Sequence, residues 1–165
     1  YWIKGLLEYG GVDAIIVEAD GAKGKSFKAP EKFEPVIPRD NDIVILVVGI
    51  DALNQPVNSK YIHRPEKVLR LLGNRDDGIG LKLSMDIMAK VIFHRDGLLG
   101  KVDRKEPVYL LFNKVDEGRK EDAIQLAKWI LKENRVHRYE KLKVLIGQVQ
   151  DQREPINLVL DAKTL

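Results

Sequence analysis

Two carboxylates and several lysines follow one short apolar run, and this pattern is typical of chemistry on a nucleotide phosphate. The run is residues 14–19, and the residues at or after its end are Glu18, Asp20, Gly21, Lys23, Lys25 and Lys28. A carboxylate held at a strand end beside a sharp glycine turn can bind Mg²⁺ and orient it on phosphate oxygens. We therefore predict an acidic tip of the Walker B kind, where Asp20 and Glu18 bind Mg²⁺ and act in catalysis with Lys23. Gly21 and Lys25 are expected to contact the nucleotide.

A plainer interpretation is that Asp20 and Gly21 form a turn and that the lysines belong to a solvated loop. Glu18 argues against it, because a carboxylate within an apolar strand needs a partner. Residues 19–26 also imitate a P-loop, since they end in Gly-Lys-Ser. A true P-loop is followed directly by a helix whose N-terminus receives the phosphates. The following residues instead include prolines that exclude this helix, so we expect the Walker A segment to be missing from this sequence. These prolines are Pro30, Pro35 and Pro38.

A second candidate site follows the apolar run at residues 108–112. The sequence there is Asn113-Lys114-Val115-Asp116, the NKxD pattern that GTP-binding proteins place after a buried strand. In that pattern the aspartate accepts two hydrogen bonds from guanine, the asparagine contacts the base edge, and the lysine stem lies along the ring. We predict that Asn113, Lys114 and Asp116 bind the base. The alternative, that Asp116 is the N-cap of the next helix, is compatible with this role.

Asp51 is a third candidate, because it follows the apolar run at residues 43–49. A nucleotide-binding role and a turn-capping role are both open for this residue. His63 and Arg64 precede a predicted helix start and could face an anion. The three histidines are too scattered along the chain to predict a metal site.

Four apolar runs are expected to be strands, at residues 14–19, 43–49, 108–112 and 143–149. Helix patterns separate the later runs. Continuously apolar strands that alternate with helices predict an α/β fold, with a mostly parallel sheet flanked by helices on both faces, as in P-loop NTPases. Ligands of such folds bind beyond the carboxyl ends of the strands, where all the candidate residues fall.

Three helices are expected from their start and stop signals. Pro65 begins the first, which ends before Gly73. Ser84 caps the second. The third covers residues 118–134 and buries one apolar stripe. Residues 151–165 are open between an edge strand and a loose tail.

Composition restricts the class of protein. The chain has 165 residues, 44% of them hydrophobic, and no cysteine, which predicts a single domain over residues 1–165 without disulfides. Basic and acidic residues are interspersed with a net charge of +3, so no nucleic-acid partner is expected. No apolar stretch approaches the ~20 residues that span a membrane, and we expect a cytoplasmic protein without a membrane partner. The opening residues resemble the end of a helix, so we expect the C-terminal part of a P-loop NTPase-like domain.

The order of the motifs resembles the YqeC-type family. These motifs are Glu18-Ala19-Asp20-Gly21-Ala22-Lys23-Gly24, Lys28-Ala29-Pro30, Glu34-Pro35-Val36-Ile37-Pro38, Val48-Gly49-Ile50-Asp51-Ala52-Leu53, His63-Arg64-Pro65-Glu66, Gly97-Leu98-Leu99 and Asn113-Lys114-Val115-Asp116. The family is described as accessory proteins of selenium-dependent molybdenum hydroxylases and looks similar to metal-insertion GTPases. The resemblance implies a P-loop NTPase-like fold and a role in maturing or inserting a metal cofactor.

Two functions are therefore expected as alternatives. The first is a nucleotide-binding accessory protein that uses Mg²⁺ and GTP or ATP, with a molybdenum hydroxylase or its cofactor intermediate as partner. It would hydrolyse the nucleotide only with an upstream Walker A segment, because little else positions the β- and γ-phosphates. The second is a non-catalytic module, without NTPase activity, whose proline-rich loop at residues 30–38 docks a partner protein or cofactor intermediate. The oligomeric state is open in both.

Overall fold

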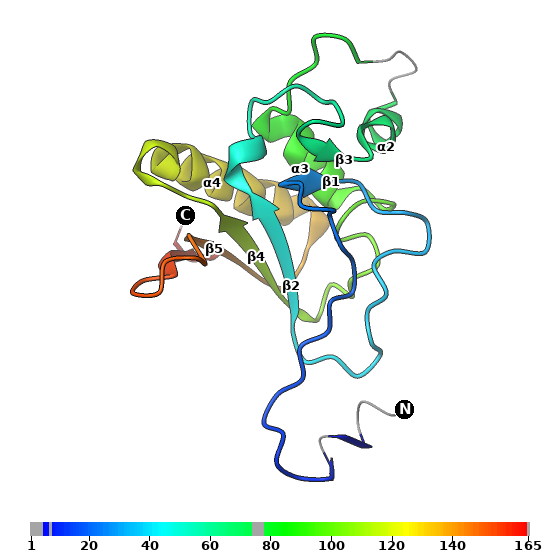
Figure 1. Cartoon of the computed structure of the whole chain (residues 1–165), viewed down its shortest axis with the longest axis vertical. Helices are drawn as coiled ribbons and strands as arrows, with labels where there is room; N and C mark the ends of the chain where they lie inside the picture. The colour runs from blue at the N-terminus through cyan, green and yellow to red at the C-terminus, as the bar shows by residue number, and fades with distance from the viewer. Residues whose placement is uncertain (1–4, 7, 74–77, 165) are drawn as a thin grey trace.

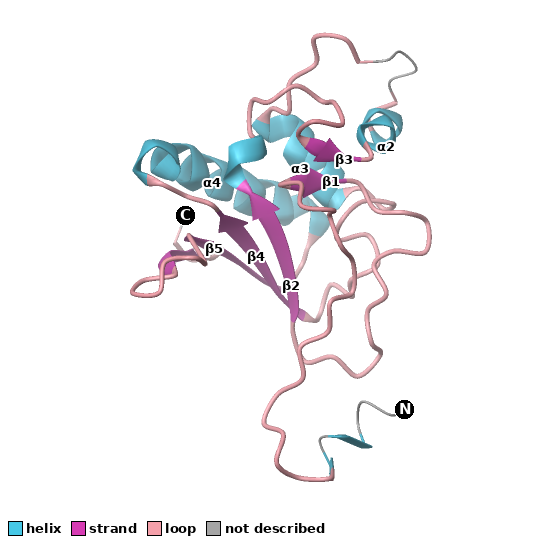
Figure 2. Cartoon of the chain, in the orientation of Figure 1, coloured by secondary structure: helices cyan, strands magenta, loops and turns pink. Residues whose placement is uncertain are grey.

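The fold is built around one four-stranded sheet. The computed structural model describes residues 5–6, 8–73 and 78–164. The strand order is β2-β4-β5-β6; the strands are β2 (Val44–Gly49), β4 (Pro107–Asn113), β5 (Lys141–Gly147) and β6 (Ile156–Leu160). The first three are parallel and β6 is antiparallel to β5 (Figures 1 and 2). The predicted α/β class with a mostly parallel sheet is thus confirmed, and the end of the chain supplies an edge strand.

Helix α4 (Lys120–His137) packs against this sheet, and α3 (Met85–Phe93) packs against α4. The Ser84 hydroxyl caps α3 by accepting a hydrogen bond from the Ile87 N–H at 3.3 Å, as the sequence predicts. α4 buries one stripe, consisting of Ala123, Leu126, Ala127, Ile130 and Leu131. This stripe recurs at helical spacing and packs on the strand residues Val108, Leu110 and Val144, which are fully buried.

A smaller unit contacts this core at the carboxyl end of β2, where the Gly49 N–H donates to the Ser26 carbonyl. It contains a two-stranded parallel sheet of β1 (Phe27–Lys28) and β3 (Ile62–His63), followed by α2 (Pro65–Leu71). Pro65 is at the first position of α2, and Gly73, after the helix end, has a positive φ of 73°, as its predicted stop role requires. Short 3-10 turns follow β2 at Ile50–Ala52 and β4 at Glu117–Arg119.

The strand expected at residues 14–19 is wrong. This segment is irregular in the structure, and Ile16 and Val17 are exposed at 97% and 43%. A strand needs a neighbour that pairs with its N–H and C=O groups. The main-chain hydrogen bond recorded for this segment joins the Val36 N–H to the Ala19 carbonyl at 3.0 Å and is not part of a ladder.

The expected covering of both sheet faces is also wrong for the described part of the chain. α4 passes behind β2 and β4 in Figure 1, and the residues of that face are buried. On the opposite face Ile45 and Val47 of β2 are 60% and 54% exposed. No helix among the described residues is long and apolar enough to cross a membrane.

Candidate functional site

The carboxyl ends of β2 and β4 bring three distant segments together. Gly49 and Asn113 end these strands opposite each other in the register. Lys114, the next residue, has a φ of 63° and turns away from the strand. Its Nζ donates to the Ser26 Oγ at 2.6 Å and to the Asp51 Oδ2 at 3.3 Å. An ammonium, a hydroxyl and a carboxylate therefore meet at the sheet edge where α/β folds bind ligands.

Gly49 allows this close approach. Its N–H donates to the Ser26 carbonyl at 2.8 Å. A Cβ at this position would be 2.6 Å from both the Ser26 Cβ and the Asp51 Oδ1, which is too close for any real contact. The glycine thus fixes the Ser26 loop against the end of β2.

Asp51 has one oxygen in use and one unused. Its Oδ2 accepts from Lys114, while its Oδ1 is buried without a hydrogen-bond partner among the described residues. Most buried polar atoms in native proteins have a partner. The sequence left a binding role and a turn role open for Asp51, and both roles stay predictions.

Of the NKxD residues, Asn113 has a structural role, whereas Lys114 and Asp116 are exposed. The Asn113 Oδ1 accepts from the Lys114 N–H at 2.8 Å and from the Val149 N–H at 3.0 Å, which ties the loop after β4 to the loop after β5. Asp116 precedes the 3-10 turn but its side chain makes no capping hydrogen bond. Its carboxylate pairs instead with Arg119, and both side chains are about half exposed. Base recognition by this loop stays a prediction.

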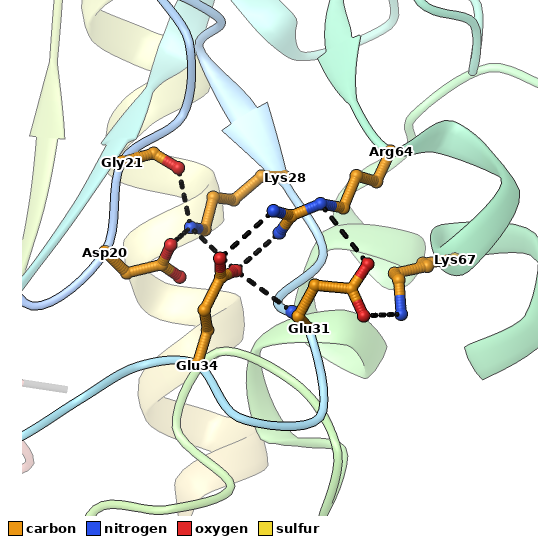
Figure 3. Close-up of polar contacts among 7 residues, drawn as sticks. All are labelled: Asp20, Gly21, Lys28, Glu31, Glu34, Arg64 and Lys67. Carbon is orange, nitrogen blue, oxygen red and sulfur yellow. Dashed lines mark hydrogen bonds and ion pairs between the residues drawn. The ribbon is translucent and has the colours of Figure 1, made fainter.

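A second cluster is an ion-pair network between the loop at residues 20–34 and the start of α2 (Figure 3). The Lys28 ammonium pairs with the Asp20 carboxylate and donates to the Gly21 carbonyl at 2.9 Å. Its Nζ is also 3.8 Å from the Glu34 Oε2. The Lys28 side chain is only 9% exposed, so a buried cation occupies the centre of the loop.

The outer half of the network is centred on Arg64. Its guanidinium donates to both oxygens of Glu34, with Nη2 3.0 Å from Oε1, and its Nε is 3.5 Å from the Glu31 Oε1. The Glu31 Oε2 is 2.6 Å from the Lys67 Nζ. The network therefore contains three cations and three carboxylates and is balanced in charge.

These contacts shift the pKa values of the network. The hydrogen bond from Arg64 lowers the pKa of Glu34 to about 2. The hydrogen bond from Lys67 lowers the pKa of Glu31. Burial raises the pKa of Asp20, although Lys28 opposes this, and burial also lowers the pKa of His63. Glu34 and Glu31 consequently stay ionised over the physiological range.

The Mg²⁺ role predicted for Asp20 and Glu18 stays a prediction, and the surroundings of both residues differ from the expected strand tip. Asp20 is held by an ammonium instead of facing an open position, and it lies on a loop instead of a strand tip. Glu18 is exposed, and the part of the chain that the structure describes contains no group of three or more metal-binding side chains. The two other lysines of the loop are apart from Asp20's ion pair: Lys23 is exposed, and Lys25 donates to the Lys60 carbonyl at 3.0 Å.

Sequence reasoning assigned no role to two residues of these clusters, Ser26 and Glu34, and it left the anion partner of Arg64 unnamed. Ser26 was visible only as the end of the false P-loop pattern. Glu34 and Arg64 lie in motifs of the family resemblance, but their direct pairing joins residues 30 positions apart. No local spacing rule could have found that contact.

The fold and the site define an α/β protein with a mostly parallel sheet and a polar cluster at its carboxyl edge. A model of the family described as "YqeC protein" matches residues 1–66. The chain is also 36% identical over 89 residues to "Uncharacterized protein YqeC" of Escherichia coli (strain K12). This match covers 54% of the chain and 34% of the relative, so the chain matches about a third of that relative's length. Both comparisons agree with the resemblance to the YqeC-type family that the motifs indicate, over the matched part of the chain. No solved structure matches the chain significantly.

Proposed function

We propose that this chain is the nucleotide-binding part of an accessory protein and that it binds a guanine nucleotide at the carboxyl ends of β2 and β4. The observation that carries the proposal is the meeting of Ser26, Asp51 and Lys114 at this edge. An ammonium and a hydroxyl can contact phosphate or ribose oxygens. The Asp51 side chain is 35% exposed, so its carboxylate can accept a hydrogen bond from a ligand hydroxyl or amine.

Recognition of the base falls to Asp116 in this proposal. The carboxylate must leave Arg119 to reach a guanine, and an exposed ion pair of this kind is worth only about 0–1 kcal/mol. Two hydrogen bonds from the base to a carboxylate would contribute roughly 1.5–3 kcal/mol each. The exchange is therefore favourable, and the exposed Asp116 is free to make it.

The family resemblance extends the proposal to the maturation of a selenium- and molybdenum-dependent hydroxylase. ATP in place of GTP and Mg²⁺ as a companion ion belong to the same proposal. Nucleotide hydrolysis is proposed only for a longer protein that supplies a Walker A segment, because no residue described in this chain cradles the β- and γ-phosphates.

A second candidate is the non-catalytic module, and the exposed apolar residues of the proline-rich loop favour it. Phe33 and Val36 are 70% and 66% exposed between Pro30 and Pro38. Large apolar side chains held in solvent by a proline-rich loop are suited to docking a partner protein. This function needs no nucleotide.

The two functions are separated by titrating the purified protein with fluorescent GTP, ATP and XTP in the presence of Mg²⁺. Asp116→Asn should shift preference from GTP towards XTP by tenfold or more, because the substitution replaces an acceptor with a donor. Asp86→Asn is the matched control, since Asp86 also forms an exposed ion pair, with Lys90 on α3. Unchanged preference in Asp116→Asn would refute base recognition by this loop. Absence of nucleotide binding by the unaltered protein would refute the nucleotide proposal and favour the docking module.

A further inference from the structure

Part of the ion-pair network lines a cleft of about 280 Å³, and Asp20 is not among the lining residues. Its walls are the loop at residues 30–34, the outer side of α2, and the loop at residues 95–101 that follows α3. Ser26, Asp51 and Lys114 are not among its lining residues. The cleft is therefore distinct from the nucleotide site proposed above.

The cleft carries a net positive charge after the charges that cancel in ion pairs are left out. Glu31 and Glu34 line it, but their charges are matched by Lys67 and Arg64. Asp96 is matched by Arg95, whose Nε is 3.4 Å from the Asp96 Oδ2. Three further cations line the cleft and form no ion pair or hydrogen bond with the described residues; they are Lys32, Arg70 and Lys101. Three cations that are unpaired within the described part of the chain, around one concave surface, attract a multiply charged anion.

The walls of the cleft are fixed by contacts that do not involve these three cations. The Glu31 N–H donates to the Glu34 Oε2 at 3.0 Å, and the Glu34 N–H donates to the Glu31 carbonyl at 2.9 Å. Gly97 packs so tightly under the third wall that an added Cβ would collide with the Val91 carbonyl. A preformed cleft binds a ligand without the entropic cost of ordering its own walls.

Several motifs that the nucleotide proposal leaves unused converge here. Pro30 and Glu34 come from the proline-rich motifs, and Gly97 comes from the Gly97-Leu98-Leu99 motif. Arg64, of the fifth motif, joins Glu34 to Glu31 (Figure 3). The network thus holds together segments that are remote in sequence without drawing on the three outer cations of the cleft.

We infer that this cleft is a second ligand site, which binds a small molecule bearing a multiply charged oxyanion. Phosphate esters and polycarboxylates share this chemistry. The guanidinium of Arg70 can grip two oxygens of such a group at once, and Lys32 and Lys101 add point charges from the two flanking loops. This inference does not depend on the proposed nucleotide site, so a result that refutes one of them leaves the other untouched.

Isothermal titration of the whole chain with inorganic pyrophosphate, at constant ionic strength, tests this inference. Saturable binding is expected, and Arg70→Gln and Lys101→Gln should each weaken it roughly tenfold, the usual loss for one charge-assisted hydrogen bond. Lys128→Gln, which removes an exposed lysine from α4, is the matched control and should bind normally. All three residues are exposed, so the circular dichroism spectra should be unchanged and folding should not obscure the result.

Two further measurements locate the binding site and identify the class of ligand. Lys114→Ala should leave intact the component of pyrophosphate binding that Arg70→Gln and Lys101→Gln weaken, because Lys114 is at the other site. Tighter binding of pyrophosphate than citrate assigns a phosphate ligand, and the reverse assigns a polycarboxylate. The inference is overturned if neither anion saturates, if Lys128→Gln loses as much affinity as Arg70→Gln, or if only Lys114→Ala weakens binding.

Discussion

Glu34 is the residue whose replacement tests the ion-pair network most directly. Its side chain is 16% exposed and accepts from Arg64 through both oxygens and from the Glu31 N–H. Glu34→Gln keeps the shape and one acceptor oxygen but removes the charge. Arg64 then keeps Glu31 as its remaining carboxylate partner, at 3.5 Å.

The size of the effect follows from the pKa of Glu34. A pKa lowered from 4.5 to about 2 corresponds to an upper limit of roughly 3 kcal/mol at neutral pH. Asp20 opposes this gain, because burial raises its pKa and its ionised form is disfavoured in the fold. We therefore expect Glu34→Gln to lower the free energy of unfolding by about 1–3 kcal/mol at pH 7, and each kcal/mol lowers the Tm by about 2–4 °C.

The dependence on pH has a definite sign. Because the pKa of Glu34 is lower in the folded chain, its stabilisation is complete above the ordinary value of 4.5 and disappears as the pH falls through about 2. The difference between the unaltered protein and Glu34→Gln should therefore be largest at pH 7 and roughly halved at pH 3. Urea denaturation at both pH values measures it, and Glu140→Gln, an exposed glutamate, is the control. A difference that is absent at pH 7, or equal at the two pH values, would refute the role assigned to Glu34.

Two other substitutions test the sheet edge and the helix cap. Gly49→Ala should weaken nucleotide binding in the titration above, because the new methyl group would displace the Ser26 loop from Asp51. Gly24→Ala is the control for an added methyl group, because its methyl group would meet open space. The positive φ of Gly24 adds some backbone strain to this control. Normal binding by Gly49→Ala would contradict the site geometry. Ser84→Ala should lower the free energy of unfolding by about 1 kcal/mol through loss of the cap on α3. Thermal denaturation measures this loss, and no change in Tm would show that the cap contributes nothing.

The sequence by itself determined the elements whose signals are local. β4 and α4 were predictable because an uninterrupted apolar run and a helical apolar stripe each need only the residues within them. Pro65 and Ser84 marked helix starts for the same reason, since a cap acts on the next turn of its own chain. The position of Asn113, Lys114 and Asp116 after a buried strand followed directly.

Only the tertiary structure decided what residues 14–19 and Asp20 do. The apolar run has the composition of a strand, but a strand exists only where a neighbour pairs with it. Without that ladder Asp20 is on a loop, where the returning chain places Lys28 against it. A carboxylate that the sequence pattern places at a strand tip is therefore part of a buried ion pair on a loop.

The same reason separates the candidate residues that meet from those that do not. Lys114 and Ser26 are 88 positions apart and share a 2.6 Å hydrogen bond, because β2 and β4 are neighbours in the sheet. Glu34 and Arg64 meet because β1 pairs with β3. The residue types in the sequence determined which side chains could take part in a site. Strand pairing determined their partners, because contacts between residues far apart in sequence depend on where the chain folds back on itself.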